Sequence, residues 1–467
     1  MNRILATRSV LLLMIVLLVA ASCATGSDPT RLDGPNPILD SGSVVFQGPD
    51  ANIFVIAWDR SQPIRLTSGA MAGRLSYPAY AWAGDRVVYV AHDRSADGRL
   101  TAAFYTAVPG GRSVRVWRDD SVAPFFLYPS PDGSRVGYLG GSAGTTGFRM
   151  ESVDLGNRQR VVHGVGQPFY TAWSPSGTQI VSHINGAPGR AAALRIDDVD
   201  TLPRIGRAGV PSPSDPSPSV PSPLGSTAAP RLPLRPGAFQ TPAYNADGSR
   251  IAVVLRNGAG SGIHFLDATG EDLGRLADTR GAVAMSFAPD GNSISYIDGG
   301  YSATGSVVGP LVVAGATNRR LSDAATAFFW SPDSLKLVFF EPYLTRDGSP
   351  TLMYRVRMYS VIDRQVFTVA TMRPAQSFTQ QIVPFFDQYA RGYSIWSPDS
   401  RLLALNTVSI AGSEVIHLVD TDTVGPFDFI RVSASGSSDT EALGLVPGEG
   451  VRSRPLAFGS NPFFAPE

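Results

Sequence analysis

Two stretches of the chain are nearly identical: FWSPDSLKLVFF at residues 329–340 and IWSPDSRLLAL at residues 395–405. Each passes from apolar and aromatic residues through Ser-Pro-Asp into a second apolar segment. Apolar segments on both sides of turn residues predict two strands joined by a tight turn. The Asp carboxylate can accept hydrogen bonds from backbone N–H groups within that turn. Where Gly follows the Asp, it supplies a positive φ.

The same pattern recurs along most of the chain. Its copies centre on Gly84, Asp132, Ser176, Asp247, Asp290, Asp333 and Asp399, at intervals of 43 to 48 residues apart from two longer ones of 71 and 66. Further strand-like segments follow each pair, for example at 262–270 and 413–423. A period of this length, with four strands per copy, predicts an all-β fold, the β-propeller with four-stranded blades.

The two ends of the repeat region predict the number of blades. Residues 43–69 read as strands two to four of a blade that lacks its first strand, and residues 451–462 read as a first strand with a worn turn. The two ends would complete one blade between them, which closes the ring and protects its edges. We therefore expect eight blades over residues 42–462. The alternative is seven blades with the termini packed outside.

The composition favours a globular β protein and argues against a nucleic-acid partner. Hydrophobic residues make up 43% of the 467 residues, and 48 Gly and 37 Pro indicate many turns. The 39 basic residues balance 39 acidic ones, and Lys336 is the only lysine. Nucleic-acid binding needs a basic surface, which a scattered and balanced charge does not predict.

The N-terminus has the features of a secretory signal peptide over residues 1–22. Arg3 and Arg8 precede an unbroken apolar run at residues 10–21, and small residues then lead to Cys23. Twelve apolar residues are few for a membrane-spanning helix. The polar, Gly- and Pro-containing residues after Cys23, up to residue 41, are typical of a flexible tether.

Cys23 is the only cysteine, so it cannot form an internal disulfide. The sequence AASC at 20–23 resembles the lipobox of bacterial lipoproteins, with Ala20 where leucine is favoured. The resemblance implies lipidation of the Cys23 sulfur and acylation of its amine, and two or more acyl chains anchor stably. It also implies that the exported protein is anchored to a bacterial membrane and faces the periplasm or the cell exterior. The alternatives are an ordinary cleaved signal and an uncleaved anchor.

The repeat itself resembles the TolB-type propeller repeat, whose core reads W-S-P-D-G. The resemblance covers residues 77 to about 435 and rests on the seven copies. TolB carries an α/β domain before its propeller, and no segment of this chain reads as such a domain. The resemblance therefore concerns the repeat and not the whole protein.

Two insertions interrupt the repeat. Residues 203–237 are rich in Pro and Ser and predict an exposed loop, with Pro-rich recognition as the alternative. Residues 372–394 are aromatic, and we interpret Phe385, Phe386, Tyr389 and Tyr393 as candidate contacts for a partner. The alternative is that this segment folds down as additional core, in a short helix that caps one face.

Other candidate sites favour structural interpretations. GGSAG at 140–144 matches a nucleophile elbow at Ser142, but a strand follows where a helix is required. Asp420 and Asp422 begin like a calcium loop, yet Arg431 stands where the bidentate Glu belongs, so a turn is expected. We expect the carboxylates of a second acidic group, Asp197, Asp198 and Asp200, to be solvated. The histidines show no spacing typical of metal ligands; they are His92, His163, His183, His264 and His417. No metal or cofactor is predicted.

These features predict a monomeric, lipid-anchored cell-envelope module that binds a protein or peptide and is not an enzyme. The alternative is an envelope enzyme, a glycan hydrolase or lyase, with its site at the mouth of the central channel. Two or more carboxylates or a histidine cluster converging in the channel would favour the enzyme. An aromatic and mostly neutral rim would favour the binding module.

Overall fold

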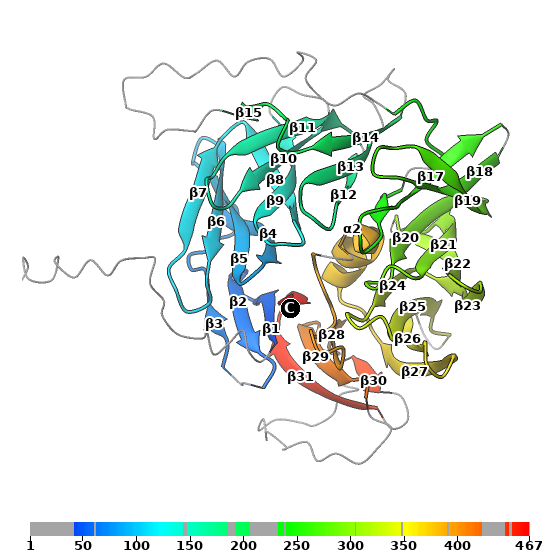
Figure 1. Ribbon diagram of the computed structural model, residues 1–467. Coiled ribbons are helices and arrows are strands. Elements are labelled where there is room, and N and C mark those ends of the chain that lie inside the picture. The colour runs from blue at the N-terminus through cyan, green and yellow to red at the C-terminus, as the bar shows by residue number, and fades with distance from the viewer. Residues whose placement is uncertain are drawn as a thin grey trace, which may run out of the picture.

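The computed structural model contains eight β-sheets arranged as blades around a central channel (Figure 1). The structure describes residues 42–59, 62–142, 147–167, 169–184, 192–205, 232–237, 240–258, 260–303, 305–346, 349–389, 392–422, 444–447 and 451–466. The predicted signal peptide, Cys23, the tether and most of the Pro/Ser-rich insertion lie outside these residues. None of the helices within the described ranges has the length and hydropathy of a membrane-spanning segment.

Blades 1 to 4 follow one another along the chain, each built from antiparallel strands. Blade 1 contains β32 (Ser460–Phe464), β1 (Ser43–Gln47), β2 (Ile53–Ala57) and β3 (Ile64–Arg65). Blade 2 contains β4 (Leu75–Ala83), β5 (Arg86–Arg94), β6 (Leu100–Ala107) and β7 (Val114–Asp119). Blade 3 contains β8 (Val122–Pro129), β9 (Arg135–Ser142), β10 (Phe148–Asp154), β11 (Arg160–Gly166) and, at its outer edge, β15 (Arg204–Ile205). Blade 4 contains β12 (Phe169–Trp173), β13 (Gln179–Ile184) and β14 (Ala193–Asp198).

Blades 5 to 8 complete the ring. Blade 5 contains β16 (Ala243–Tyr244), β17 (Ile251–Asn257), β18 (Gly260–Leu266) and β19 (Asp272–Thr279). Blade 6 contains β20 (Ala282–Phe287), β21 (Ile294–Tyr301), β22 (Val307–Ala314) and β23 (Arg319–Ala325). Blade 7 contains β24 (Ala327–Trp330), β25 (Lys336–Leu344), β26 (Leu352–Ser360), β27 (Gln365–Met372) and β30 (Leu445–Pro447). Blade 8 contains β28 (Leu402–Val408), β29 (Glu414–Asp420) and β31 (Arg452–Phe458), with Trp396 bridged to Leu403 on the inner side.

The two ends of the chain close the ring, which confirms the eight-bladed prediction. β32 pairs antiparallel with β1, with Val44 opposite Phe464 and Val45 opposite Phe463. The predicted closing strand at 451–462 was wrong in its position. β31 instead forms the outer strand of blade 8 by pairing with β29. The burial pattern explains the difference, because β32 buries Phe463 and Phe464 whereas β31 leaves most of its side chains half-exposed.

The turns after the first strands of blades 2 to 8 contact one another between neighbouring blades. The Asp carboxylates of these turns accept hydrogen bonds from the backbone N–H two residues later, as predicted; examples are Asp132, Asp247, Asp290, Asp333 and Asp399. In one of these turns, close contact with the neighbouring blade requires glycine in addition to the positive φ. A Cβ on Gly133 would lie 2.5 Å from the backbone nitrogen of Gly84 in the preceding blade. These two neighbouring turns therefore contact each other through their backbones.

Two serines replace this glycine in blades 7 and 8. Ser334 and Ser400 keep positive φ angles of 63° and 60°. Each hydroxyl accepts a hydrogen bond from the preceding blade: Ser334 from the Asp290 N–H at 2.9 Å, and Ser400 from the Asp333 N–H at 3.0 Å. These bonds offset the cost of the left-handed backbone, which is of order 1 kcal/mol for a residue with a Cβ.

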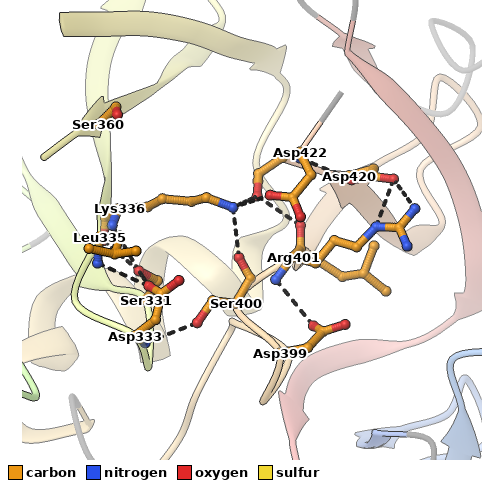
Figure 2. A network of polar contacts seen from close by, with 12 residues as sticks. Ser331, Asp333, Leu335, Lys336, Ser360, Asp399, Ser400, Arg401, Asp420 and Asp422 are labelled. Atoms are coloured by element: carbon orange, nitrogen blue, oxygen red, sulfur yellow. Dashed lines mark hydrogen bonds and ion pairs between the residues drawn. The ribbon is translucent and has the colours of Figure 1, made fainter. Parts of the chain in front are cut away.

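Lys336 extends the link between blades 7 and 8 (Figure 2). Its ammonium group donates to the Ser400 carbonyl at 3.0 Å and pairs with Asp422, while Arg401 pairs with Asp420 at 2.7 Å within blade 8. Asp420 and Asp422 are therefore paired with basic residues, and residues 423–431 of the segment compared with a calcium loop lie outside the described residues. Arg135 makes the same kind of link from blade 3 to the Gly177 carbonyl in blade 4, at 3.0 Å.

Candidate functional site

The aromatic insertion at 372–394 lies inside the ring. It forms a π-helical turn η2 (Phe378–Ile382), a 3₁₀ turn η3 (Val383–Phe385) that contains Pro384, and the short helix α2 (Phe386–Tyr389). α2 contacts β12, β20 and β24, which are the innermost strands of blades 4, 6 and 7 (Figure 1). The insertion therefore occupies the channel that the eight blades surround.

Aromatic side chains of the insertion pack against rings of the inner strands. Phe386 lies 4.8 Å from Phe328 between ring centroids, and Tyr393 lies 4.6 Å from Phe463. Phe385 contacts Phe126 at 5.1 Å. The insertion thus connects aromatic rings from opposite sides of the channel. Each aromatic pair contributes about 0.5–1.5 kcal/mol beyond the contribution of its buried surface area.

The four candidate partner contacts lie mostly in this core. Phe386 is 1% exposed, Tyr389 and Tyr393 are each 5% exposed, and Phe385 is partly buried. Their position agrees with the alternative proposed from the sequence. In that alternative, the segment folds down as extra core in a short helix. Among the four, Tyr393 also lines the small pocket described below.

Three polar contacts fix the insertion in one orientation. The Tyr128 hydroxyl donates to Gln388 Oε1 at 2.7 Å. The Tyr393 hydroxyl donates to the Leu127 carbonyl at 2.8 Å, and Asn461 Nδ2 donates to Gln381 Oε1 at 2.6 Å. These partners come from blades 3 and 1. The insertion is therefore held by directional bonds as well as by apolar packing.

A small pocket remains between the insertion and blades 3 to 6. Its volume is about 50 Å³, which is room for a few water molecules or one small chemical group. Most of the lining is aromatic, proline or small and polar; the residues are Tyr128, Pro129, Pro131, Thr171, Ala172, Trp173, Pro242, Ala243, Tyr244, Ser286, Asp387, Gln388, Gly392 and Tyr393. Asp387 is the one acidic residue of this lining. An aromatic and mostly neutral rim is the arrangement expected for a binding module.

The Asp387 carboxyl has an unusual environment. Burial raises its pKa from 3.8 to about 7, and this effect outweighs the Thr241 hydroxyl and nearby backbone N–H groups, which favour the ionised form. The residue as a whole is nevertheless only partly buried. Its charge in turn raises the pKa of the Tyr128, Tyr170 and Tyr301 hydroxyls, in addition to the larger effect of their own burial.

The sequence interpretation missed Asp387 and the pocket residues other than Tyr393. One signal was available, since Asp387 is the only acidic residue in the aromatic insertion. A carboxylate within an apolar segment is costly to bury unless it is paired or functional. The remaining lining residues belong to four different blades, and their convergence depends on the ring geometry.

The other sequence candidates have structural positions. Ser142 ends β9, and β10 follows in an antiparallel hairpin with Phe148 opposite Gly141, so the nucleophile-elbow context is absent there. His264 and His417 lie in β18 and β29, as predicted for strand residues. Among the described residues, no three His, Cys, Asp or Glu side chains converge as metal ligands would.

The prediction of a solvated acidic group was wrong for Asp197. Its side chain is fully buried, 2.6 Å from Arg195 Nη2 and 3.5 Å from His163 Nδ1. His163 also hydrogen-bonds to the Ser152 hydroxyl at 2.9 Å. The pairing with a basic residue compensates the charge, because a buried ion without a partner would cost several kcal/mol.

A second buried ionic group joins blades 2 and 3. Glu151 is fully buried, 2.7 Å from Arg160 Nη2, and accepts a hydrogen bond from the Tyr138 hydroxyl. Arg160 also reaches Asp119 of blade 2 at 2.9 Å and lies over the Trp117 ring. Arg160 thus joins carboxylates of both blades, which indicates a structural role.

An eight-bladed β-propeller with a channel filled by its own insertion is the class of protein that this fold and site define. Neither protein-family models nor curated proteins show a match to the chain. Similar solved structures include oligogalacturonate lyase from Vibrio parahaemolyticus, at 11% identity over 81% of this chain and 97% of that one, with a TM-score of 0.43.

Two further solved structures show a similar degree of likeness. The β-propeller domain of the Trilobed protease from Pyrococcus furiosus is 10% identical over 84% of this chain and 98% of that one, with a TM-score of 0.41. TolB from Acinetobacter baumannii is 13% identical over 80% of this chain and 82% of that one, with a TM-score of 0.36. Likeness at this level carries no argument about activity or ligand.

Proposed function

We propose that this protein is a lipid-anchored module of the cell envelope that binds a protein or peptide and catalyses no reaction. The observation that carries the proposal is the lining of the channel pocket, where rings and prolines from blades 3, 4 and 5 and from the insertion meet one carboxylate. Rigid aromatic side chains are enriched at recognition sites because they offer large contact areas at a low cost in conformational entropy.

The anchor in this proposal rests on the signal peptide and on Cys23. Fully extended, residues 24–41 would span about 60 Å at 3.3–3.6 Å per residue. Such a tether lets the ring stand clear of the membrane surface to which Cys23 is attached. The pocket would then be accessible to partners in the periplasm or at the cell exterior.

Site-specific photo-crosslinking in cells tests the proposal. Pro131 lines the pocket and is exposed, so a photoreactive residue placed there reports on a bound partner. Ile362 is 72% exposed on the β26–β27 hairpin of blade 7 and serves as the matched control. We expect one envelope protein to crosslink from position 131 and not from position 362. Failure to crosslink any protein from position 131, or the same adducts from both positions, would contradict the proposal.

The alternative, an envelope glycan hydrolase or lyase, has one observation in its favour. A carboxyl group with a pKa of about 7 in a channel is suited to general acid or base catalysis. A glycan hydrolase generally uses two carboxyl groups, however, and the described pocket lining contains only Asp387. Cleavage of envelope glycans by the purified protein, abolished by D387N, would establish the alternative instead.

A further inference from the structure

The first observation concerns the charge balance of the pocket. Asp387 has no ion-pair partner within 4.0 Å among the described residues. The fully buried carboxylates Glu151, Asp197 and Asp420 are all paired with arginines. Asp387 is thus a carboxylate that the described part of the fold leaves without a counter-charge.

The second observation concerns the rings beside this carboxylate. The Tyr128, Trp173, Tyr244 and Tyr393 side chains line the same pocket. The faces of aromatic rings carry negative potential and attract cations within about 6 Å of the ring centre. A carboxylate and four aromatic side chains line one small cavity, a combination of groups that favours positive charge.

The third observation is the size of the cavity. A volume of about 50 Å³ accommodates an ammonium group with its adjoining methylene groups, and not a sugar ring or a nucleotide. The rest of a ligand would lie on the rim, where Pro131 and the turns of neighbouring blades are exposed. The pocket is therefore suited to one charged tip of a larger molecule.

We propose that the pocket binds a primary ammonium group of the partner polypeptide, with Asp387 as the ion-pair partner and the surrounding rings as cation–π contacts. This inference rests on the proposed binding function and specifies its chemistry. Two sources share that chemistry, a lysine side chain and a free amino terminus. They are distinguished by the probes below.

Ligand-observed saturation-transfer NMR on the purified protein tests the inference directly. The probes are butylammonium, which matches the lysine tip, and n-butanol, its neutral counterpart. At pH 8 we expect saturation transfer to butylammonium and at least tenfold weaker binding of n-butanol. Equal binding of the two probes would overturn the inference, because charge would then play no role.

Variants identify the residue responsible. D387N keeps the shape of the side chain and removes its charge, so butylammonium should bind at least tenfold more weakly. D323N is the matched control, since Asp323 is 84% exposed on blade 6, is paired with Arg320, and lies outside the pocket lining. Binding that D387N leaves unchanged would refute the assignment to Asp387.

A pH comparison on the unaltered protein needs no variant. Butylammonium stays charged at pH 5.5 and pH 8, since alkylammonium groups have a pKa of about 10.4. Between these values Asp387 changes from mostly neutral to mostly ionised, because burial raises its pKa to about 7. Tyr128, Tyr170 and Tyr301 stay neutral, and so does His183, whose pKa is lowered to about 4 by burial. Binding should weaken about tenfold at pH 5.5; pH-independent binding would contradict the inference.

Two blocked amino acids distinguish the sources. Nα-acetyl-lysine amide presents only the side-chain ammonium, and alanine amide presents only the α-ammonium. Stronger binding of either compound assigns the source, and binding of neither contradicts the inference. Crosslinking of a partner from position 131 without any ammonium binding would leave the proposed function standing and remove only this inference.

Discussion

Four tryptophans at one position of the repeat show how single side chains hold neighbouring blades together. The indole N–H of Trp82, Trp173 and Trp396 donates to a main-chain carbonyl in the inner strand of the preceding blade, at 3.1, 2.6 and 3.1 Å. The fourth, Trp330, has a buried indole nitrogen for which the structure shows no hydrogen-bond partner. The tryptophan thus contributes packing in the four blades that carry it and an additional inter-blade bond in three of them.

This difference predicts unequal effects of the same substitution. Trp396→Phe removes the bond to Phe329 and leaves that carbonyl without its donor, so we expect a loss of about 2–4 kcal/mol in the free energy of unfolding. Trp330→Phe removes no such bond and should cost about 1–2 kcal/mol less. Urea unfolding of both variants measures the difference. A larger loss for Trp330→Phe would contradict this account of the position.

Asp387 predicts a pH-dependent contribution to stability. Its pKa is about 7 in the folded protein and 3.8 in an unfolded chain, so the folded state binds one more proton between these values. The stability that Asp387 contributes is full below pH 4 and is lost as the pH rises through about 7. D387N removes this dependence. Relative to the unaltered protein, D387N should therefore gain on the order of 2 kcal/mol between pH 5 and pH 8, measured by denaturant unfolding at both values. An identical difference between the two proteins at both pH values would contradict the raised pKa.

At the scale of elements, the insertion acts as a core for the channel. Its local pattern left two alternatives open, aromatic contacts for a partner and a short helix that folds down as additional core, and the structure contains the buried rings and short helix of the second. The sequence could not decide whether the rings face solvent or the inner strands. That outcome depends on the width of the channel and on Phe126, Phe328 and Phe463, which lie far away in the sequence.

The neighbours Phe385 and Phe386 provide a matched pair for this role. Phe386→Ala removes a fully buried ring from between Phe328 and Phe329 and should lower the free energy of unfolding by about 3–5 kcal/mol. Phe385 is only partly buried against Phe126, and Phe385→Ala should cost about half as much. Chemical denaturation of the two variants gives the comparison. Equal and small losses would mean that the insertion does not form part of the core.

The serine turns also belong to this scale. Ser400→Ala leaves the Asp333 N–H without its acceptor and keeps the strained φ of 60°, so it should cost about 1–2 kcal/mol. Ser400→Gly loses the same bond but relieves the backbone, so its cost should be smaller by roughly 1 kcal/mol. Thermal unfolding of the two variants measures this order. A less stable glycine variant would show that the backbone carries no strain at this position.

For the whole molecule, the ring depends on the pairing of its two ends. β32 supplies the inner strand of blade 1, and its Phe463 carbonyl accepts the Trp82 bond from blade 2. Removal of residues 460–467 would expose β1 as an edge strand and remove two buried phenylalanines. We expect the truncated protein to melt at least 10 °C lower and to aggregate, as measured by calorimetry and light scattering. An unchanged melting temperature would mean that the ring does not need this closure.

The sequence predicted the ring better than the site, for a physical reason. The strand pairs and turns are local patterns, repeated around Asp132, Asp333 and Asp399, and each copy specifies its own blade. Repetition also predicted the closure by the termini, although β32 and β31 were not distinguished. The pocket was not predictable in this way, because Tyr128, Tyr244 and Asp387 meet only through the curvature of the closed ring.

The central claim is that the insertion folds into the channel and holds the Asp387 carboxyl in an enclosed pocket. The most direct test is an NMR titration of the protein labelled with ¹³C at the aspartate carboxyl groups, with the Asp387 resonance assigned as the one that D387N lacks. The account predicts that this carboxyl titrates with a pKa of about 7. A value near the ordinary 3.8 would show that the carboxyl lies in open water, and it would contradict the filled channel and the pocket built upon it.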